Sequence, residues 1–378
     1  MLTVGVEEEY LLLDAATGLP AARAGQVRRA ADLQPAIDGS EVQRELLQAQ
    51  LEIATPVCGS AAEIGAHLER LRHALGAAAR AHDCRLAACA TAPFTDRMPV
   101  PVTDTTRYRA MRADAPQLTD EQLITGMHVH VGVPDRDAGV AVLGRLRPWL
   151  PLLVALSANS PLWQGVDTGF ASWRTVVFGR WPVSGVPPRF ADARDYDDRI
   201  HALVRSGLIG DVGQLYWQVR LSERYPTVEI RAMDVQLRVD EAVMLAGLVR
   251  AVAAVALAGR SAGQGQGQPH GLPHPDRPPH PHPHQETLSA AVWYAARHGC
   301  TERLYDPIGG TLDSPPAVVG RVLQALGPAL ADNGDTDRVE PVLGRLLQDG
   351  NGAVRQRREL RRGGRAGLLD TVVEETDP

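Results

Sequence analysis

The chain contains no lysine, and all 39 of its basic residues are arginine. This absence excludes a Walker A phosphate loop, a protein-kinase phosphate lysine and a Schiff-base lysine. If the protein handles phosphate, arginine and metal ions must supply the positive charge. Arginine suits that task because its guanidinium can bind a carboxylate or a phosphate with two parallel hydrogen bonds.

Cysteine is also scarce, and the four cysteines show no C-x-x-C spacing, so we expect reduced thiols and neither a disulfide framework nor a zinc site. The N-terminus lacks the basic and apolar regions of a signal peptide, and we find no apolar run of membrane-spanning length. We therefore expect a cytoplasmic protein without a membrane partner. The net charge of −6 gives no reason to expect nucleic acid either.

The first stretch of the chain, MLTVGVEEEYLLLD, alternates with period two and predicts a β-strand. On that strand Glu7 and Glu9 share one face, and Glu8 lies on the other. Two carboxylates about 7 Å apart on one face repel each other. The flanks are strongly apolar, which favours a central strand over a solvated edge strand. The acidic face of such a strand needs a cation, either a metal ion or an arginine.

Two further stretches place acid or histidine on a strand face. Glu52 alternates with aliphatic residues in LEIAT, whereas Glu45 lies seven residues earlier. In one continuous strand this odd spacing puts the two acids on opposite faces, so both can face one site only across a bulge or break. In GMHVHVGV, His128 and His130 share one face and are candidates for metal ligands, phosphate contacts or satisfied core residues.

Residues 214–234 predict a hairpin in which Arg220 shares a face with Gln218, and Glu229 shares a face with Arg231. A sheet face that meets water is often polar, but this one combines Glu, His and Arg. That composition favours metal ligands and phosphate-binding arginines. Residues 159–190, rich in glycine and proline, predict an ordered loop system that carries Arg174 and Arg180.

Helical patterns follow the strands. A capping box at Ser60 begins a long helix, and further helices are predicted over 138–158, 240–260, 287–299 and 317–347. Residues 261–286 form a low-complexity linker rich in Gly, Gln, Pro and His. We predict a single α+β domain over 1–378, with the helical part 287–378 packed back on the sheet. The basic tail after residue 350 either reaches a nucleotide phosphate or is solvated.

With these residues in view, the sequence resembles the carboxylate–amine ligase family, in its type 2 glutamate–cysteine ligase branch. The matching stretches run in order: TVGVEEEYLL, ELLQAQLEIATPV, TGMHVHVGVPDRD, ALSANSPLWQGVDTGFASWR, RWPVSGVPPRF and YPTVEIRAMDV. The resemblance implies a glutamine synthetase/guanido kinase-like α+β fold. In that fold a curved antiparallel sheet carries the site on its concave face and helices on its convex side.

The resemblance also implies ATP and Mg²⁺ as cofactors and small molecules as substrates. ATP phosphorylates the γ-carboxylate of glutamate, and an amine, typically that of cysteine, attacks the acyl phosphate. Carried over by motif, the metal ligands are Glu7, Glu9, Glu45, Glu52, His128 and Glu229. The catalytic arginines are Arg231, for the transferring phosphoryl group, and Arg174. Nucleotide binding falls to Arg220, Arg180 and His130.

Three alternatives stay open at this point. The same chemistry could serve another amine or carboxylate, because no residue identifies the acceptor. His-x-His with nearby acids could hold zinc or manganese in a metal-dependent hydrolase. A catalytically inactive homologue could bind an amino acid or a nucleotide as a sensor. The sequence also leaves the formation of a homo-oligomer open.

Overall fold

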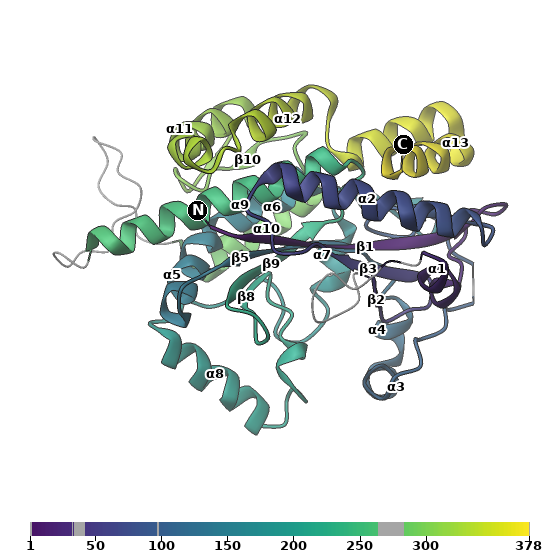
Figure 1. Ribbon diagram of the computed structural model, residues 1–378, viewed down its shortest axis with the longest axis horizontal. Helices are drawn as coiled ribbons and strands as arrows, with labels where there is room; N and C mark the ends of the chain where they lie inside the picture. The colour runs from purple at the N-terminus through teal and green to yellow at the C-terminus, as the bar shows by residue number, and fades with distance from the viewer. Residues whose placement is uncertain (1, 32, 34–41, 97, 264–282, 378) are drawn as a thin grey trace.

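The computed structural model describes the whole chain except residues 1, 32, 34–41, 97, 264–282 and 378. Figure 1 shows a layered arrangement in which a β-sheet crosses the middle of the molecule. Long helices cover one face of the sheet, and shorter helices flank the other face. Most of the predicted linker 261–286 falls outside the described residues.

The main sheet has the strand order β2-β3-β1-β5-β9-β8, with β4 paired to the far end of β1, and every pairing in it is antiparallel. Its strands are β1 (Val4–Asp14), β2 (Val42–Arg44), β3 (Gln50–Ala54), β4 (Cys84–Ala87), β5 (Gly126–Gly132), β8 (Val219–Leu221) and β9 (Thr227–Asp234). Two small hairpins complete the strands: β6 (Leu162–Trp163) with β7 (Val166–Asp167), and β10 (Leu304–Tyr305) with β11 (Leu312–Asp313). The predicted α+β class with an antiparallel sheet is confirmed.

The longer helices mostly coincide with the predicted ones. They are α2 (Ala61–Arg80), α5 (Arg136–Leu146), α6 (Leu150–Ser157), α8 (Ala193–Arg205), α9 (Val239–Gly263), α10 (Gln285–His298), α11 (Pro315–Asn333), α12 (Thr336–Asp349) and α13 (Gly352–Thr376). The shorter ones are α1 (Ala24–Ala30), α3 (Thr106–Asp114), α4 (Pro116–Asp120) and α7 (Trp173–Phe178), with single 3₁₀ turns η1 (Arg147–Trp149) and η2 (Val212–Gln214). The predicted capping box is present, since Ser60 Oγ accepts from Glu63 N at 3.2 Å.

On the helix-covered face of β1, between Val4 and Leu12, one ion pair interrupts the apolar side chains. Glu8, on the opposite face of β1 from Glu7 and Glu9, is fully buried and bonds Arg72 of α2 at 2.6 Å. The Tyr10 hydroxyl donates to the same carboxylate at 2.5 Å, and Arg72 Nη1 donates to Leu237 O at 2.7 Å. Arg72 therefore ties α2 to the strand that carries the acidic face.

Two helical stretches are long and apolar enough to cross a membrane, namely 136–157 and 239–259, which corrects the expectation that no run reaches that length. Inside this fold they are core helices, since 78% and 72% of their most apolar windows are buried. The second stretch contains Arg250, which is buried in an ion pair with Asp335 of the segment before α12. The partner lies far along the chain, so the sequence pattern alone does not reveal it.

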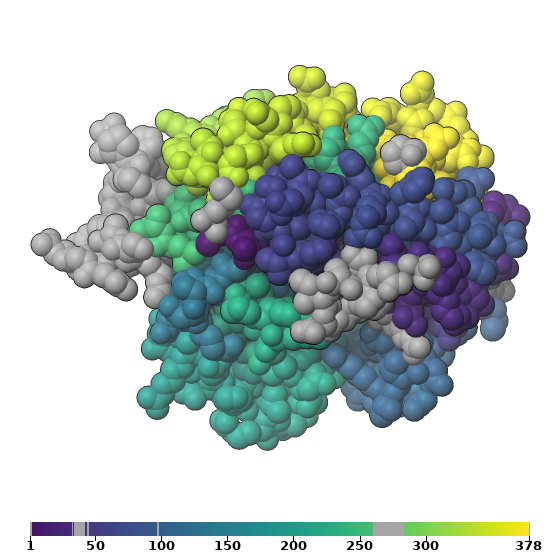
Figure 2. All heavy atoms as spheres, in the orientation of Figure 1, coloured from purple at the N-terminus to yellow at the C-terminus, as the bar shows by residue number. Residues whose placement is uncertain are grey.

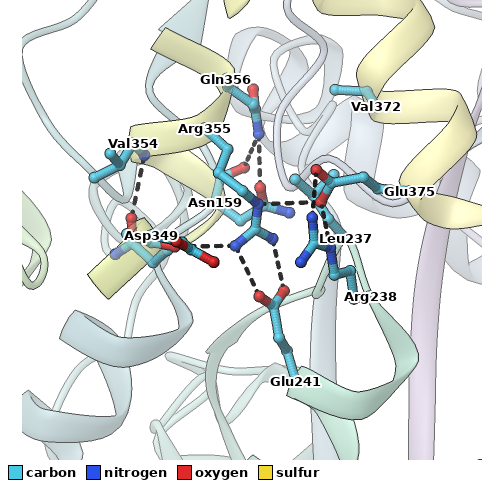
Figure 3. Close-up of polar contacts among 12 residues, drawn as sticks. Asn159, Leu237, Arg238, Glu241, Asp349, Val354, Arg355, Gln356, Val372 and Glu375 are labelled. Atoms are coloured by element: carbon cyan, nitrogen blue, oxygen red, sulfur yellow. Dashed lines mark hydrogen bonds and ion pairs between the residues drawn. The ribbon is translucent and has the colours of Figure 1, made fainter. Parts of the chain in front are cut away.

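The C-terminal helices pack against the rest of the chain and form one side of the molecule beside α2 and α9 (Figure 2). The basic tail is neither solvated throughout nor directed at the polar face of the sheet. It forms α13, where the buried Arg355 bonds Glu241 of α9 at 2.7 Å and Glu375 of α13 at 3.0 Å (Figure 3). All four cysteines are free, as the sequence predicts.

Candidate active site

The sheet register aligns the predicted polar residues in one row across five strands. Going outward from β3, the paired positions are Glu52 with Glu9, Glu7 with His128, His130 with Glu229, and Glu229 with Arg220. Directly paired residues of an antiparallel ladder point to the same side of a sheet. The row therefore lies on one face, opposite the face that α2 and α9 cover.

The first part of this row is a cluster of three carboxylates, Glu9, Glu45 and Glu52, whose oxygen atoms lie within 4.8 Å of one another. Glu45 reaches the cluster because the chain breaks after β2 and returns as β3, which is the break that its spacing required. Burial, together with the charge of Glu9, raises the pKa of Glu45 to about 7. Burial and the neighbouring Glu7 likewise raise the pKa of Glu52 well above its ordinary value. The three acids are therefore short of positive charge.

The two histidines of β5 flank Glu7. His128 Nδ1 lies 3.0 Å from Glu7 Oε2, and His130 Nε2 lies 3.4 Å from Glu7 Oε1. Burial raises the pKa of Glu7, but the hydrogen bond with His128 and the close contact with His130 outweigh it, and the pKa lies well below its usual value. Burial and the charge of Arg231 lower the pKa of His128, so its imidazole is neutral near pH 7. An ionised Glu7 can only accept, which assigns the proton to His128 Nδ1 and leaves the lone pair on Nε2.

Glu229 forms the other end of the row together with two arginines. Arg220 Nε donates to Glu229 Oε2 at 2.7 Å, and Arg231 Nη1 bonds Glu229 Oε1. Burial would raise the pKa of Glu229, but the charges of Arg231 and Arg220 outweigh it and lower the pKa. Burial would lower the pKa of Arg231, yet Glu229 and the acids of β1 raise it. Glu229 thus stays ionised and holds both guanidiniums in the site.

The structure brings Arg174 to this face. The Arg174 side chain, on α7, is 2% exposed, and its Nη2 donates to the carbonyl oxygen of Arg231 at 3.3 Å. Arg180 is paired instead with Glu121, the residue after α4. That Arg180 binds the nucleotide stays a prediction. Its pattern, an arginine next to a tryptophan in a loop, does not fix where the loop lies.

Four buried nitrogen atoms of this face have no hydrogen-bond partner within the described part of the chain. They are His128 Nε2, His130 Nε2, Arg174 Nε and Arg231 Nε. Buried polar atoms without partners are uncommon and costly, and a concentration of them indicates a place built for a ligand. Three sets of ligand atoms lie close enough for a cation: Glu7, Glu52 and His128; Glu7, His130 and Glu229; and Glu9, Glu45 and Glu52. This mainly carboxylate donor set fits Mg²⁺ better than Zn²⁺.

Sequence reasoning missed a β-bulge that shapes the site. Two residues of β9, Arg231 and Ala232, lie opposite the single His128 of β5, between the pairs Ile230–Val129 and Met233–Met127. A bulge shifts the period-two alternation by one residue. As a result Asp234 pairs with Gly126 and joins the polar face of Glu229 and Arg231, although an unbroken strand would place it on the other face. Gly126 N also donates to Glu9 Oε2 at 2.6 Å, a contact without any side-chain signal.

The similarity of the chain to known proteins shows its family. The model of glutamate-cysteine ligase family 2 (GCS2) matches residues 3–375. The chain belongs to this family. It is 41% identical over 378 residues, 100% of this chain and 95% of the relative, to a Saccharopolyspora erythraea protein named "Putative glutamate–cysteine ligase 2-1". It is 38% identical to a similarly named Rhodopirellula baltica protein, covering 100% of this chain and 97% of the relative.

The fold of this family member also resembles a solved structure. A crystal structure of a glutamate–cysteine ligase from Francisella tularensis in complex with AMP matches with a TM-score of 0.67 and 13% identity, covering 99% of this chain and 88% of that chain. At that identity the likeness establishes the fold alone. Family membership makes the protein an ATP-dependent ligase that forms C–N bonds. The metal-dependent hydrolase is thereby set aside.

Proposed function

We propose that this ligase phosphorylates the γ-carboxylate of glutamate with ATP and joins the resulting acyl phosphate to an amine, with cysteine as the first candidate. The observation that carries the proposal is the row of acids, histidines and arginines on one sheet face, in a chain of the glutamate–cysteine ligase family. The reaction needs positioning and charge neutralisation more than a protein nucleophile. We also expect the enzyme to work in the cytoplasm, where ATP is available.

The acids would hold magnesium. Glu9, Glu45 and Glu52 form one candidate ligand set. Glu7 forms a second set with Glu52 and His128, and a third with His130 and Glu229. Bound magnesium would neutralise the negative charge of the ATP phosphates. His128 supports this role because its Nε2 lone pair is free while Nδ1 is fixed by Glu7.

The arginines would stabilise the negative charge on the transferring phosphoryl group and on the substrate. Arg231 is buried among acids, keeps its charge, and has an unused Nε–H, so it can donate to an oxygen of the transferring phosphoryl group. Arg220 would keep Glu229 and Arg231 in place through its two bonds to Glu229, at 2.7 and 3.2 Å. Arg174 has an unused Nε–H as well and would bind an anionic oxygen of a substrate.

The test is ADP release with ATP, Mg²⁺, glutamate and a panel of amines that includes cysteine. Glutamate whose carboxylate carries ¹⁸O should transfer one ¹⁸O to the released phosphate, because the acyl phosphate forms through a carboxylate oxygen. Arg231→Ala should abolish most of the amine-dependent turnover. The matched control is Arg85→Ala, since Arg85 is a part-exposed strand arginine paired with Asp370 away from the row.

Two results would overturn the proposal. Release of AMP and pyrophosphate in place of ADP would exclude the acyl phosphate and indicate an acyl adenylate. Absence of turnover with every amine, while ATP and Mg²⁺ still bind, would make the chain an inactive binding homologue. If glutamate supports turnover but cysteine is no better than other amines, the glutamate step stands and the cysteine acceptor is wrong.

A further inference from the structure

The guanidinium of Arg174 is buried but weakly held. Its Nη2 bond to Arg231 O is long at 3.3 Å, and its Nε has no hydrogen-bond partner among the described residues. It lies instead over the ring of Phe178, 5.2 Å from the centroid. A group with so few direct contacts must be aimed by the backbone that carries it.

Two serine hydroxyls help to fix that backbone, together with the bonds from Trp173 N to Ser160 O at 3.0 Å and from Ser172 N to Ala296 O at 2.9 Å. Arg174 N donates to Ser160 Oγ at 3.0 Å, and Ser172 Oγ caps α7 by accepting from Thr175 N at 3.3 Å. Both hydroxyls donate in turn to the buried carboxylate of Asp234, Ser160 to Oδ2 at 2.7 Å and Ser172 to Oδ1 at 2.8 Å. One carboxylate of β9 thus holds both serine hydroxyls at the start of α7.

The bulge in β9 and a glycine make this arrangement possible. The bulge puts Asp234 on the polar face, opposite Gly126. A Cβ atom at Gly126 would lie 2.1 Å from Arg174 Nη2, so the guanidinium occupies the space that any other residue would fill. Arg174 therefore lies directly over the strand whose next polar side chain is His128.

The same loop is anchored from the C-terminal helix. Asn159 N donates to Asp234 Oδ2 at 2.8 Å, and Gln356 Nε2 of α13 donates to the carbonyl oxygen and Oδ1 of Asn159 at 2.8 and 2.7 Å (Figure 3). A Cβ at Gly352 would lie 2.0 Å from Asn159 Oδ1, so the start of α13 is packed against this side chain. All three side chains, of Asn159, Asp234 and Gln356, are 1% exposed.

We propose that Asp234 is a positioning residue that holds Arg174 over Gly126 through Ser160 and Ser172, and that Gln356 steadies the same loop from the C-terminal helix. This proposal rests on the proposed function, because Arg174 is the residue that would meet the substrate. Asp234 acts through Arg174 and touches no substrate itself. Through Gln356 and Asn159, helix α13 therefore contributes to the position of Arg174 and so to substrate binding.

The test is a double-mutant cycle with Asp234→Asn and Arg174→Ala. An amide offers one acceptor oxygen and two donors, so Asp234→Asn cannot accept from both serine hydroxyls and the Asn159 N–H. We expect kcat/KM to fall by about 10- to 100-fold, mainly through a higher KM for ATP or glutamate. The magnesium requirement should not change. In the double variant, Asp234→Asn should add less than about threefold to the loss from Arg174→Ala, because both changes remove the same function.

The matched control is Asp306→Asn. Asp306 is also 1% exposed, accepts from Ile308 N at 2.8 Å and pairs with Arg321 beside the hairpin β10–β11, away from the row. The Asp306→Asn variant should have a lower denaturation midpoint, but its KM should stay within about twofold of the wild-type value, as expected of a distant site. Gln356→Leu should raise KM in the same direction as Asp234→Asn, by a smaller factor.

The proposal would be overturned if the losses in kcat/KM from the two single variants multiply in the double variant. It would also be overturned if Asp306→Asn changes KM as much as Asp234→Asn does. If Asp234→Asn does not fold, Ser160→Ala and Ser172→Ala replace it, each removing one hydroxyl. An unchanged KM in both serine variants would also overturn the proposal. Should the wild-type enzyme show no turnover, the ligase proposal fails separately. Calorimetric measurement of ADP binding with Mg²⁺ to the same variants then tests whether Asp234 positions Arg174. Equal ADP affinity in all variants would refute that role.

Discussion

Magnesium binding to the nucleotide-free protein should release protons near neutral pH. Glu45 has a pKa of about 7, because it is buried and lies beside Glu9, and the pKa of Glu52 is also raised. A cation that binds these carboxylates must displace their protons. At pH 7 Glu45 is about half protonated, so it contributes about half a proton per site on binding, and Glu52 adds to that figure.

The sign of the pH dependence follows. Lower pH adds protons to Glu45 and Glu52, and these protons compete with Mg²⁺, so the apparent affinity falls as the pH falls. For Glu45 alone, the change from pH 8 to pH 6 should weaken the apparent affinity by about tenfold. Above pH 8 Glu45 should contribute little further change in the apparent Mg²⁺ affinity, because its carboxylate is then already ionised without the metal.

The assay is isothermal titration calorimetry of Mg²⁺ at pH 7 in two buffers with different ionisation enthalpies, which counts the protons released. Glu45→Gln is the variant that removes one titrating ligand, and it should lower the proton count. Arg85→Ala is the control and should leave the count unchanged. A count near zero in the wild-type protein, or equal affinity at pH 6 and pH 8, would refute the idea that these acids hold the metal.

Two further outcomes are expected. Arg231→Ala should lower kcat by about 10³-fold at little change in KM. Glu229→Gln should raise the Mg²⁺ concentration for half-maximal rate and also lower kcat, because Glu229 holds Arg231 in place. Steady-state kinetics with a magnesium titration measures both effects, and near-normal rates with unchanged titrations would remove the pair from the site. Glu8→Gln should cost about 3–5 kcal/mol of unfolding free energy, because it leaves the buried Arg72 without its counter-ion. The variant Arg194→Ala, which removes an ion pair exposed on both sides, should cost about 0–1 kcal/mol. Urea denaturation that finds equal losses for the two variants would contradict this reasoning.

Much of the polar face was predictable from local pattern. Period-two alternation in β1 and β5 assigns Glu7 and Glu9 to one face and pairs His128 with His130, since successive side chains of a strand point to opposite sides. The same rule showed that Glu45 and Glu52 could meet only across a break, and the chain reversal between β2 and β3 supplies it. These inferences succeed because they depend on neighbours in the chain.

Local sequence pattern is therefore enough to show which side chains share a face within each strand, and the motifs are enough to show the family. The order of the strands, which lets acids from β3, β1 and β9 meet in one row, is seen only in the folded chain. The folded chain also shows that a bulge turns Asp234 toward Arg174 and that Arg180 pairs with Glu121 instead. The physical reason is that strand register, bulges and loop placement are set by contacts between residues far apart in the chain, and no local period encodes them.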